Sequence, residues 1–196
     1  MSEKIECIWK KAIFREENAP IERSSHAVSI IGGTLYVIGG ENTARIPIDS
    51  TVYALDISNQ NLKDGSAVWR KIEPEHPRFA PSPRIAHAQA TIGKKIYIFG
   101  GRQGITMDES PLNDLHYFDT VKEEWVEVAM VGKVGNVPSP RSFHKMVSVG
   151  SSLFVFGGCG NDGRMSDLYE FMTEEHYWIK HSNVSYISTL HQIIFT

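Results

Sequence analysis

The chain has 196 residues, a net charge of −3 and two cysteines, Cys7 and Cys159. A chain of this length can bury one sizeable core, and the balanced charge provides no basic field that would attract nucleic acid or an anionic membrane. Two cysteines are too few for a disulfide framework or a four-ligand zinc site. No apolar run approaches the roughly 20 residues of a membrane span, and no signal-peptide pattern is present. We therefore expect a cytoplasmic or nuclear protein that binds neither nucleic acid nor membrane.

The first predicted element is a strand within residues 5–14, around Trp9. Its pattern is that of the last strand of each repeat described below, and the other three strands of such a unit do not accompany it. We predict a stray fourth strand that completes a sheet formed elsewhere.

The next elements form a pattern that occurs three times, in residues 23–70, 84–127 and 141–180. Each copy begins with Arg-x-x-His, continues with an apolar strand and a Gly-Gly pair, and ends near a tryptophan. In every copy the histidine precedes the first paired glycine by 13 residues, which identifies a structural repeat. The copies carry Arg23, His26, Gly39-Gly40 and Trp69; Arg84, His87, Gly100-Gly101 and Trp125; and Arg141, His144, Gly157-Gly158 and Trp178.

Each copy is predicted to form four short strands. The second strand is a continuous apolar run (35–38, 96–99 and 153–156), which is typical of strands buried on both faces. The paired glycines that end it indicate a place where two backbones pass closely. A four-stranded sheet cannot bury both faces alone, so the repeats predict an all-β fold of radially stacked sheets.

The pattern decays after Trp178. Residues 181–196 contain strand-forming residues but neither Arg-x-x-His nor Gly-Gly, so we predict a degenerate or partial unit. Three full units fall short of the four to eight blades of a closed propeller. The sequence leaves two explanations open: a truncated or divergent chain, or self-association of two copies that closes a ring.

These motifs resemble those of Kelch-type β-propellers, and the resemblance implies that residues 1–196 are a single propeller segment. It has three full blades, with partial blades at both ends. The chain also resembles the plant nitrile-specifier, epithiospecifier and thiocyanate-forming proteins. That likeness is carried by residues 39–49, by Gly100-Gly101-Arg102-Gln103-Gly104, and by Gly157-Gly158-Cys159-Gly160.

The subfamily resemblance implies an iron-dependent protein that acts on glucosinolate aglucones or another sulfated small molecule. It also implies catalytic arginines at the positions of Arg84 and Arg141, and a guanidinium is a fixed fork of donors that suits a sulfate leaving group. The iron motif implied with them is acid-x-x-x-Asp-x-x-x-His, and the sequence contains no such spacing. Its absence favours a protein that is not an enzyme and that needs no cofactor.

The loops after the paired glycines differ between copies, and such loops on a rigid scaffold commonly bind ligands. We predict a non-catalytic interaction module, a scaffold or adaptor, that binds a protein or peptide on this loop face. The predicted binding residues are Glu41, Arg45, Arg102, Arg164 and the repeated Arg23, Arg84 and Arg141.

The repeated arginines and histidines each allow two interpretations. The arginines line an anion or acidic-peptide site, or they pair with backbone carbonyls or with a carboxylate of a neighbouring blade. The histidines form a three-histidine metal cluster, or each forms a hydrogen bond within its own blade.

Overall fold

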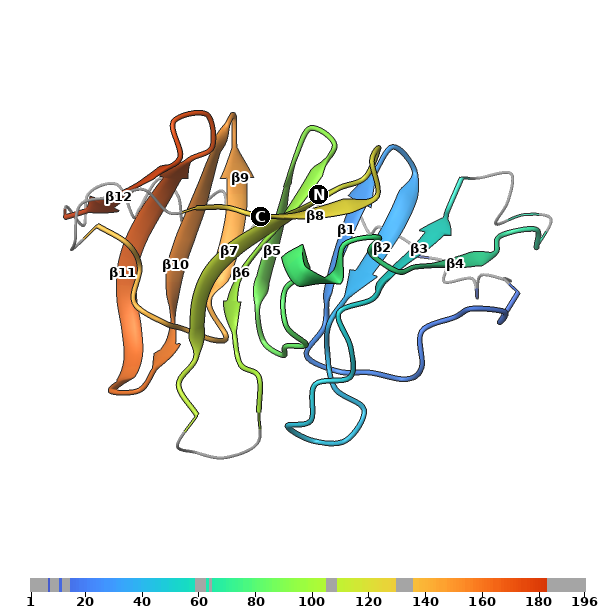
Figure 1. Cartoon of the computed structure of the whole chain (residues 1–196), viewed down its shortest axis with the longest axis horizontal. Coiled ribbons are helices and arrows are strands. Elements are labelled where there is room, and N and C mark those ends of the chain that lie inside the picture. The colour runs from blue at the N-terminus through green and yellow to red at the C-terminus, as the bar shows by residue number, and fades with distance from the viewer. Residues whose placement is uncertain are drawn as a thin grey trace, which may run out of the picture.

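The computed structural model describes Cys7, Lys11, residues 15–58, Lys63 and residues 65–104, 109–129 and 136–182. These residues form three four-stranded antiparallel sheets that stand side by side, which we call blades 1, 2 and 3 (Figure 1). The predicted all-β fold of three full four-stranded blades is confirmed, and the three sheets of the described residues do not close into a ring. The predicted strand at 5–14 and the partial blade at 181–196 lie almost entirely outside the described residues.

Each blade is a meander in which successive strands are neighbours. Blade 1 contains β1 (Ala27–Ile31), β2 (Thr34–Ile38), β3 (Val52–Asp56) and β4 (Trp69–Ile72). Blade 2 contains β5 (Ala88–Ile92), β6 (Lys95–Gly101), β7 (Leu112–Asp119) and β8 (Glu124–Glu127). Blade 3 contains β9 (Lys145–Val149), β10 (Ser152–Gly160), β11 (Gly163–Met172) and β12 (Tyr177–His181). A short 3-10 helix, η1 (Pro77–Phe79), lies between blades 1 and 2 in the chain. No helix of the described residues is long and apolar enough to cross a membrane.

The hydrophobic core lies between the blades. Apolar side chains of β6 and β7 reach both neighbours, because successive strand residues point to opposite faces of the sheet. Two of the repeated tryptophans, Trp125 and Trp178, are 3% and 2% exposed in these interfaces, as expected of large indole rings in a core. Trp69 packs on the far side of blade 1, in a cluster with Val37 and Tyr53.

The paired glycines are the places where neighbouring blades touch through their backbones. The Gly40 N–H donates to the Arg84 carbonyl (3.0 Å), and the Gly101 N–H donates to the Arg141 carbonyl (2.9 Å). Gly100 has φ +62°, and a Cβ there would lie 2.6 Å from the Arg141 carbonyl oxygen. Both the backbone conformation and the missing space therefore require glycine.

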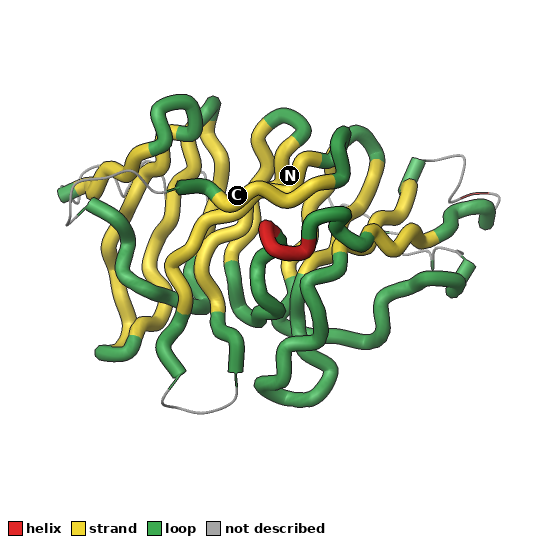
Figure 2. Tube along the Cα trace, viewed as in Figure 1, coloured by secondary structure: helices red, strands yellow, loops and turns green. Residues whose placement is uncertain are grey.

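The long loops lie at one edge of the blades. The long loops that follow β2 and β6 are at the lower edge of Figure 1, together with the two-residue turn between β10 and β11, and the tight β1–β2, β5–β6 and β9–β10 turns are at the opposite edge. Figure 2 shows the same division of loop and strand along the trace. We call the edge with the long loops the loop face.

Candidate binding face

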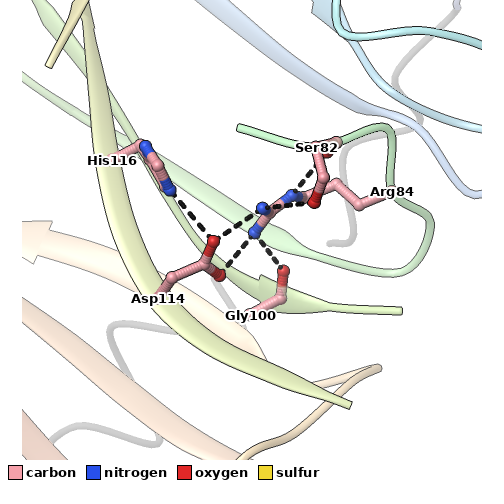
Figure 3. Close-up of polar contacts among 5 residues, drawn as sticks. All are labelled: Ser82, Arg84, Gly100, Asp114 and His116. Atoms are coloured by element: carbon pink, nitrogen blue, oxygen red, sulfur yellow. Dashed lines mark hydrogen bonds and ion pairs between the residues drawn. The ribbon is translucent and has the colours of Figure 1, made fainter. Parts of the chain in front are cut away.

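Arg84 is held inside blade 2 by contacts that use its whole guanidinium group (Figure 3). Its two Nη atoms donate to the two carboxylate oxygens of Asp114, both at 2.7 Å. It also donates to the Gly100 carbonyl (3.0 Å) and to the carbonyl and hydroxyl of Ser82. With 1% of the residue exposed, these contacts fix Arg84 in place.

Arg141 is held in the same way, and Arg23 is held by fewer contacts, since one of its buried Nη atoms has no hydrogen-bond partner among the described residues. Arg141, fully buried, pairs with Asp167 at 2.7 Å and donates to the Gly157 carbonyl. Arg23 donates to the Gly39 carbonyl (3.0 Å) and lies 3.8 Å from a carboxylate oxygen of Asp49. All three arginines therefore pair with carbonyls and a carboxylate, and the carboxylate belongs to their own blade rather than to a neighbouring one as expected. An anion-binding role for them stays a prediction, and the anion would have to displace that carboxylate.

Asp114 contacts two side chains, Arg84 and His116. The Nε2 atom of His116 lies 2.9 Å from a carboxylate oxygen of Asp114. Burial by itself would raise the pKa of Asp114. The hydrogen bonds from Arg84 and His116, together with their charges, outweigh burial and hold that pKa well below its usual value. Asp114 therefore stays ionised and keeps Arg84 neutralised inside the blade.

The repeated histidines do not meet in a metal site, because each lies at the start of a different blade. Neither ring nitrogen of His87 has a hydrogen-bond partner, so the interpretation of a hydrogen bond within its own blade is wrong for this residue. A Cβ on Gly39, in blade 1, would lie 2.7 Å from its Cε1. His144 packs edge-on against Phe99 of blade 2, with ring centroids 5.4 Å apart. These two rings therefore fill the space between blades.

Glu41 and Arg45 form a local loop on blade 1. Glu41 accepts hydrogen bonds from the Ser25 hydroxyl (2.6 Å) and from the Arg45 backbone N–H. The hydrogen bond from Ser25 is the main cause of a lowered pKa of Glu41. The side chain of Arg45 is exposed, so of this pair it is the one that reaches solvent.

Arg102 joins blades 2 and 3 on the loop face. Its Nε donates to the Ser142 hydroxyl (3.0 Å), and an Nη donates to the Glu109 carbonyl (3.1 Å). These contacts place its guanidinium beside the first residues of blade 3. Arg102 is therefore next to the hollow described below, whereas Glu41 and Arg45 lie two blades away.

A hollow of about 520 Å³ opens on the loop face of blade 3, lined by Phe143, Gly158, Cys159, Arg164 and Met165. Phe143 is 63% exposed. It occupies the position that Ser25 and Ala86 occupy in the other blades, and all three have positive φ, 58°, 55° and 53°. Among the predicted residues, Arg164 lines this hollow. The prediction missed Phe143, although a phenylalanine in the second variable position of Arg-x-x-His was a usable signal.

The described residues beside the repeated arginines do not form a group of ligands that could hold an iron ion. Within the described part of the chain, one group could hold a metal ion: Glu75, His76 and Glu124, whose ligand atoms lie within 4.8 Å of one another. Glu124 pairs with Asp119 at the far end of β7 from Asp114. The group is thus at the edge opposite to the arginine-bearing one.

The chain is similar to known Kelch-repeat proteins over half to nearly all of its length. A family model described as the KLHDC2/KLHL20/DRC7 Kelch-repeats domain matches residues 7–189. The chain is 31% identical over 169 residues to the N-(sulfonatooxy)prop-2-enimidothioate sulfolyase of Thlaspi arvense, which covers 86% of this chain and 45% of that protein. It is 40% identical over 102 residues to Kelch domain-containing protein 2 of Bos taurus, covering 51% and 23% of the two chains. It is 27% identical over 157 residues to Kelch domain-containing protein 10 of Homo sapiens, covering 79% and 33%. The chain therefore spans less than half the length of each of these relatives.

Proposed function

Since this chain belongs to the Kelch-repeat family, we propose that it is a non-catalytic interaction module that binds a protein or peptide on the loop face of blades 2 and 3. Its similarity to two Kelch domain-containing proteins supports an interaction module. The observation that carries the proposal is the exposed ring of Phe143 in the hollow of blade 3.

Phe143 is an energetically unfavourable residue at its position. Its ring is largely in water, and its φ of 58° is an unfavourable conformation for a bulky residue. Blades 1 and 2 have a small side chain, Ser25 or Ala86, at the same place, so blade geometry does not require an aromatic ring. An exposed aromatic residue in a concave site is the usual form of a binding anchor.

The surroundings of Phe143 indicate the chemistry of the ligand. Arg164 lines the same hollow, and Arg102 is held next to it by Ser142. Met165 adds an adaptable apolar wall. The best-matched ligand is a peptide segment with an apolar side chain for the hollow and acidic groups for the two arginines.

The first test is selection from a phage-displayed random peptide library, followed by titration of the selected peptides. We expect enrichment of peptides that combine acidic and apolar residues. Phe143→Ser, which installs the residue of blade 1, should weaken them at least about tenfold, which is about 1.4 kcal/mol. The matched control is Val121→Ser, which changes a 73% exposed apolar residue in the β7–β8 turn. Equal binding by the Phe143→Ser protein, or no enrichment, would contradict the proposal.

A second candidate function rests on the 31% identity with the sulfolyase over 86% of this chain. Under this candidate the protein would act on N-(sulfonatooxy)prop-2-enimidothioate, with Arg84 and Arg141 facing the sulfate. The test is sulfate release from that compound with and without ferrous iron. Release above the protein-free rate would support the second candidate, and release at the protein-free rate would reject it.

A further inference from the structure

The segment that connects blades 1 and 2 lies against the outer strand of blade 2. It contains Glu75 and His76, which come just before η1, and η1 contacts β8 (Figure 2). A second hollow, of about 510 Å³, opens along this contact, and we call it the β8 hollow. Its lining includes His76 and Phe79 of the connecting segment and Glu124, Trp125 and Val126 of β8.

Three side chains that can bind a metal ion come together beside the β8 hollow. One carboxylate oxygen of Glu75, one of Glu124 and a ring nitrogen of His76 lie within 4.8 Å of one another. Ligands of a zinc ion lie about 2.0–2.2 Å from it, so two ligands of a tetrahedral site are about 3.4 Å apart. Glu75 and His76 are exposed, and rotation about their side-chain bonds can therefore close the remaining gap.

The two carboxylates of this group are not neutralised by the protein. Among the residues that the structure describes, neither Glu75 nor Glu124 forms an ion pair. The glutamates just before them in the chain, Glu73 and Glu123, each pair with a lysine or an arginine, at 2.7 and 2.8 Å. Two carboxylates that lie close together repel each other, and a bound cation removes that repulsion. The charges of the group therefore favour a cation between Glu75 and Glu124.

Trp125 is an independent indication that the β8 hollow holds a ligand atom. The residue lines the hollow and is 3% exposed. Its indole N–H has no hydrogen-bond partner among the described residues. A buried donor without an acceptor is unfavourable, and most such groups in proteins are paired. An oxygen atom held in the hollow would accept this hydrogen bond.

The kinds of ligand atom select the kind of ion. Two carboxylate oxygens and an imidazole nitrogen suit zinc and related divalent transition metal ions, whereas Mg²⁺ and Ca²⁺ prefer sets made of oxygen atoms alone. Three protein ligands leave the fourth position of a tetrahedral zinc ion open. Because His76 and Glu124 also line the β8 hollow, that position can be filled from the hollow, by water or by an oxygen atom of another ligand.

We propose that Glu75, His76 and Glu124 bind a zinc ion. The ion fastens the segment between blades 1 and 2 to the first residue of β8, and it takes its fourth ligand from the β8 hollow. The site is at the edge opposite to the loop face, so it is separate from the repeated arginines and from the hollow at Phe143. Its three residues also do not form the acid-x-x-x-Asp-x-x-x-His motif.

The first test is equilibrium dialysis of the 196-residue chain against zinc. One zinc ion should bind per chain, and a large excess of Mg²⁺ should not displace it. His76→Gln and Glu124→Gln should each weaken binding at least about tenfold, because loss of even an outer partner of a metal ligand costs that much. The matched control is Glu123→Gln, which changes the adjacent glutamate that already pairs with Arg70, and it should bind zinc as the wild-type chain does.

Three results of this dialysis would overturn the proposal: no bound zinc, displacement of zinc by Mg²⁺, or equal zinc binding by the His76→Gln chain. His76 is exposed, so its replacement should leave the blades folded, and circular dichroism of the variant checks this.

The second test locates the ion by its distance from Trp125. Cobalt(II) occupies zinc sites and quenches the fluorescence of a nearby indole, so the wild-type chain should lose fluorescence until one equivalent of cobalt is bound. Trp125→Phe should remove most of this loss while zinc still binds. The double variant Cys7→Ser, Cys159→Ser should behave as the wild-type chain, because no thiolate is a ligand. Undiminished quenching in the Trp125→Phe chain would mean that the ion binds elsewhere, and the proposal would be wrong.

Discussion

At the scale of single residues, the Arg84–Asp114 pair shows what the repeated arginine does for the blade. The pair ties the start of blade 2 to β7 and, through the Gly100 carbonyl, to β6. Arg84 is buried, so removal of its partner's charge leaves an uncompensated cation in a water-poor site.

Asp114→Asn should therefore lower the free energy of unfolding by about 3 kcal/mol, the lower end of the range for a broken buried pair, because the Asp114 side chain is 32% exposed. Urea denaturation measures the loss. Arg70→Gln is the matched control, because its ion pair with Glu123 is exposed at both partners and should be worth less than about 1 kcal/mol. Equal losses in the two variants would show that burial of the Arg84 pair is unimportant.

The sequence shows that an arginine recurs at the start of each blade, but it leaves open whether these arginines bind a ligand or stabilise the blade. The deciding residues are acidic and lie 26 to 30 positions further on, near the third strand of each blade: Asp49, Asp114 and Asp167. Their recurrence was visible in the sequence. The separation from the arginine is 26 residues in blades 1 and 3 but 30 in blade 2, so a search for one fixed spacing does not find all three.

At the scale of elements, the paired glycines at the end of β6 are the joint between blades 2 and 3. A side chain on Gly100 would meet two difficulties, a positive φ and the Arg141 carbonyl oxygen. Gly93 offers a comparison, because its φ is +59° and nothing lies within 4 Å of its Cβ position.

Gly93→Ala should cost about 1 kcal/mol of unfolding free energy, the penalty for a left-handed conformation. Gly100→Ala should cost at least about 3 kcal/mol, because backbone must also move away from the new methyl group. Thermal and urea unfolding of the two proteins measure the difference. Similar values for both would mean that the close approach of the blades carries no energetic weight.

The strands and the interblade position of Trp125 and Trp178 could be predicted from the sequence because both follow from the repeat. The hollow of blade 3 could not, because it depends on one departure from the repeat, Phe143, and on how Arg164 and Met165 fold back beside it. The sequence repeat predicts the features that all three blades have in common. It does not predict a hollow that only one blade has.

At the scale of the whole molecule, unfolding is linked to pH through the two buried histidines. Burial lowers the pKa of His87 and of His144 to about 3, and the charge of the arginine at the start of the same blade acts in the same direction. In the unfolded chain a histidine takes up its proton near pH 6.5. The unfolded state therefore binds more protons than the folded state between these two values.

The free energy of unfolding should consequently fall as the pH is lowered from 6.5 towards 3, by about 1.4 kcal/mol per pH unit for each histidine. Urea denaturation at several pH values measures the slope. His87→Leu should reduce the slope by the share of one histidine while leaving that of His144. A slope unchanged by His87→Leu would show that the pH dependence comes from other groups.

The position between the arginine and the histidine of each blade has one backbone conformation and three different side chains, Ser25, Ala86 and Phe143. The backbone of this position joins neighbouring blades, because Ala86 N–H donates to the Ser25 carbonyl and Phe143 N–H donates to the Ala86 carbonyl, and the side chains take no part in these bonds. A single codon change at this position can therefore alter a ligand anchor where the side chain is exposed, as at Phe143 (63%), but not where it is buried, as at Ala86 (8%). Recognition in this molecule is modular: specificity can evolve blade by blade while the architecture that displays it stays constant.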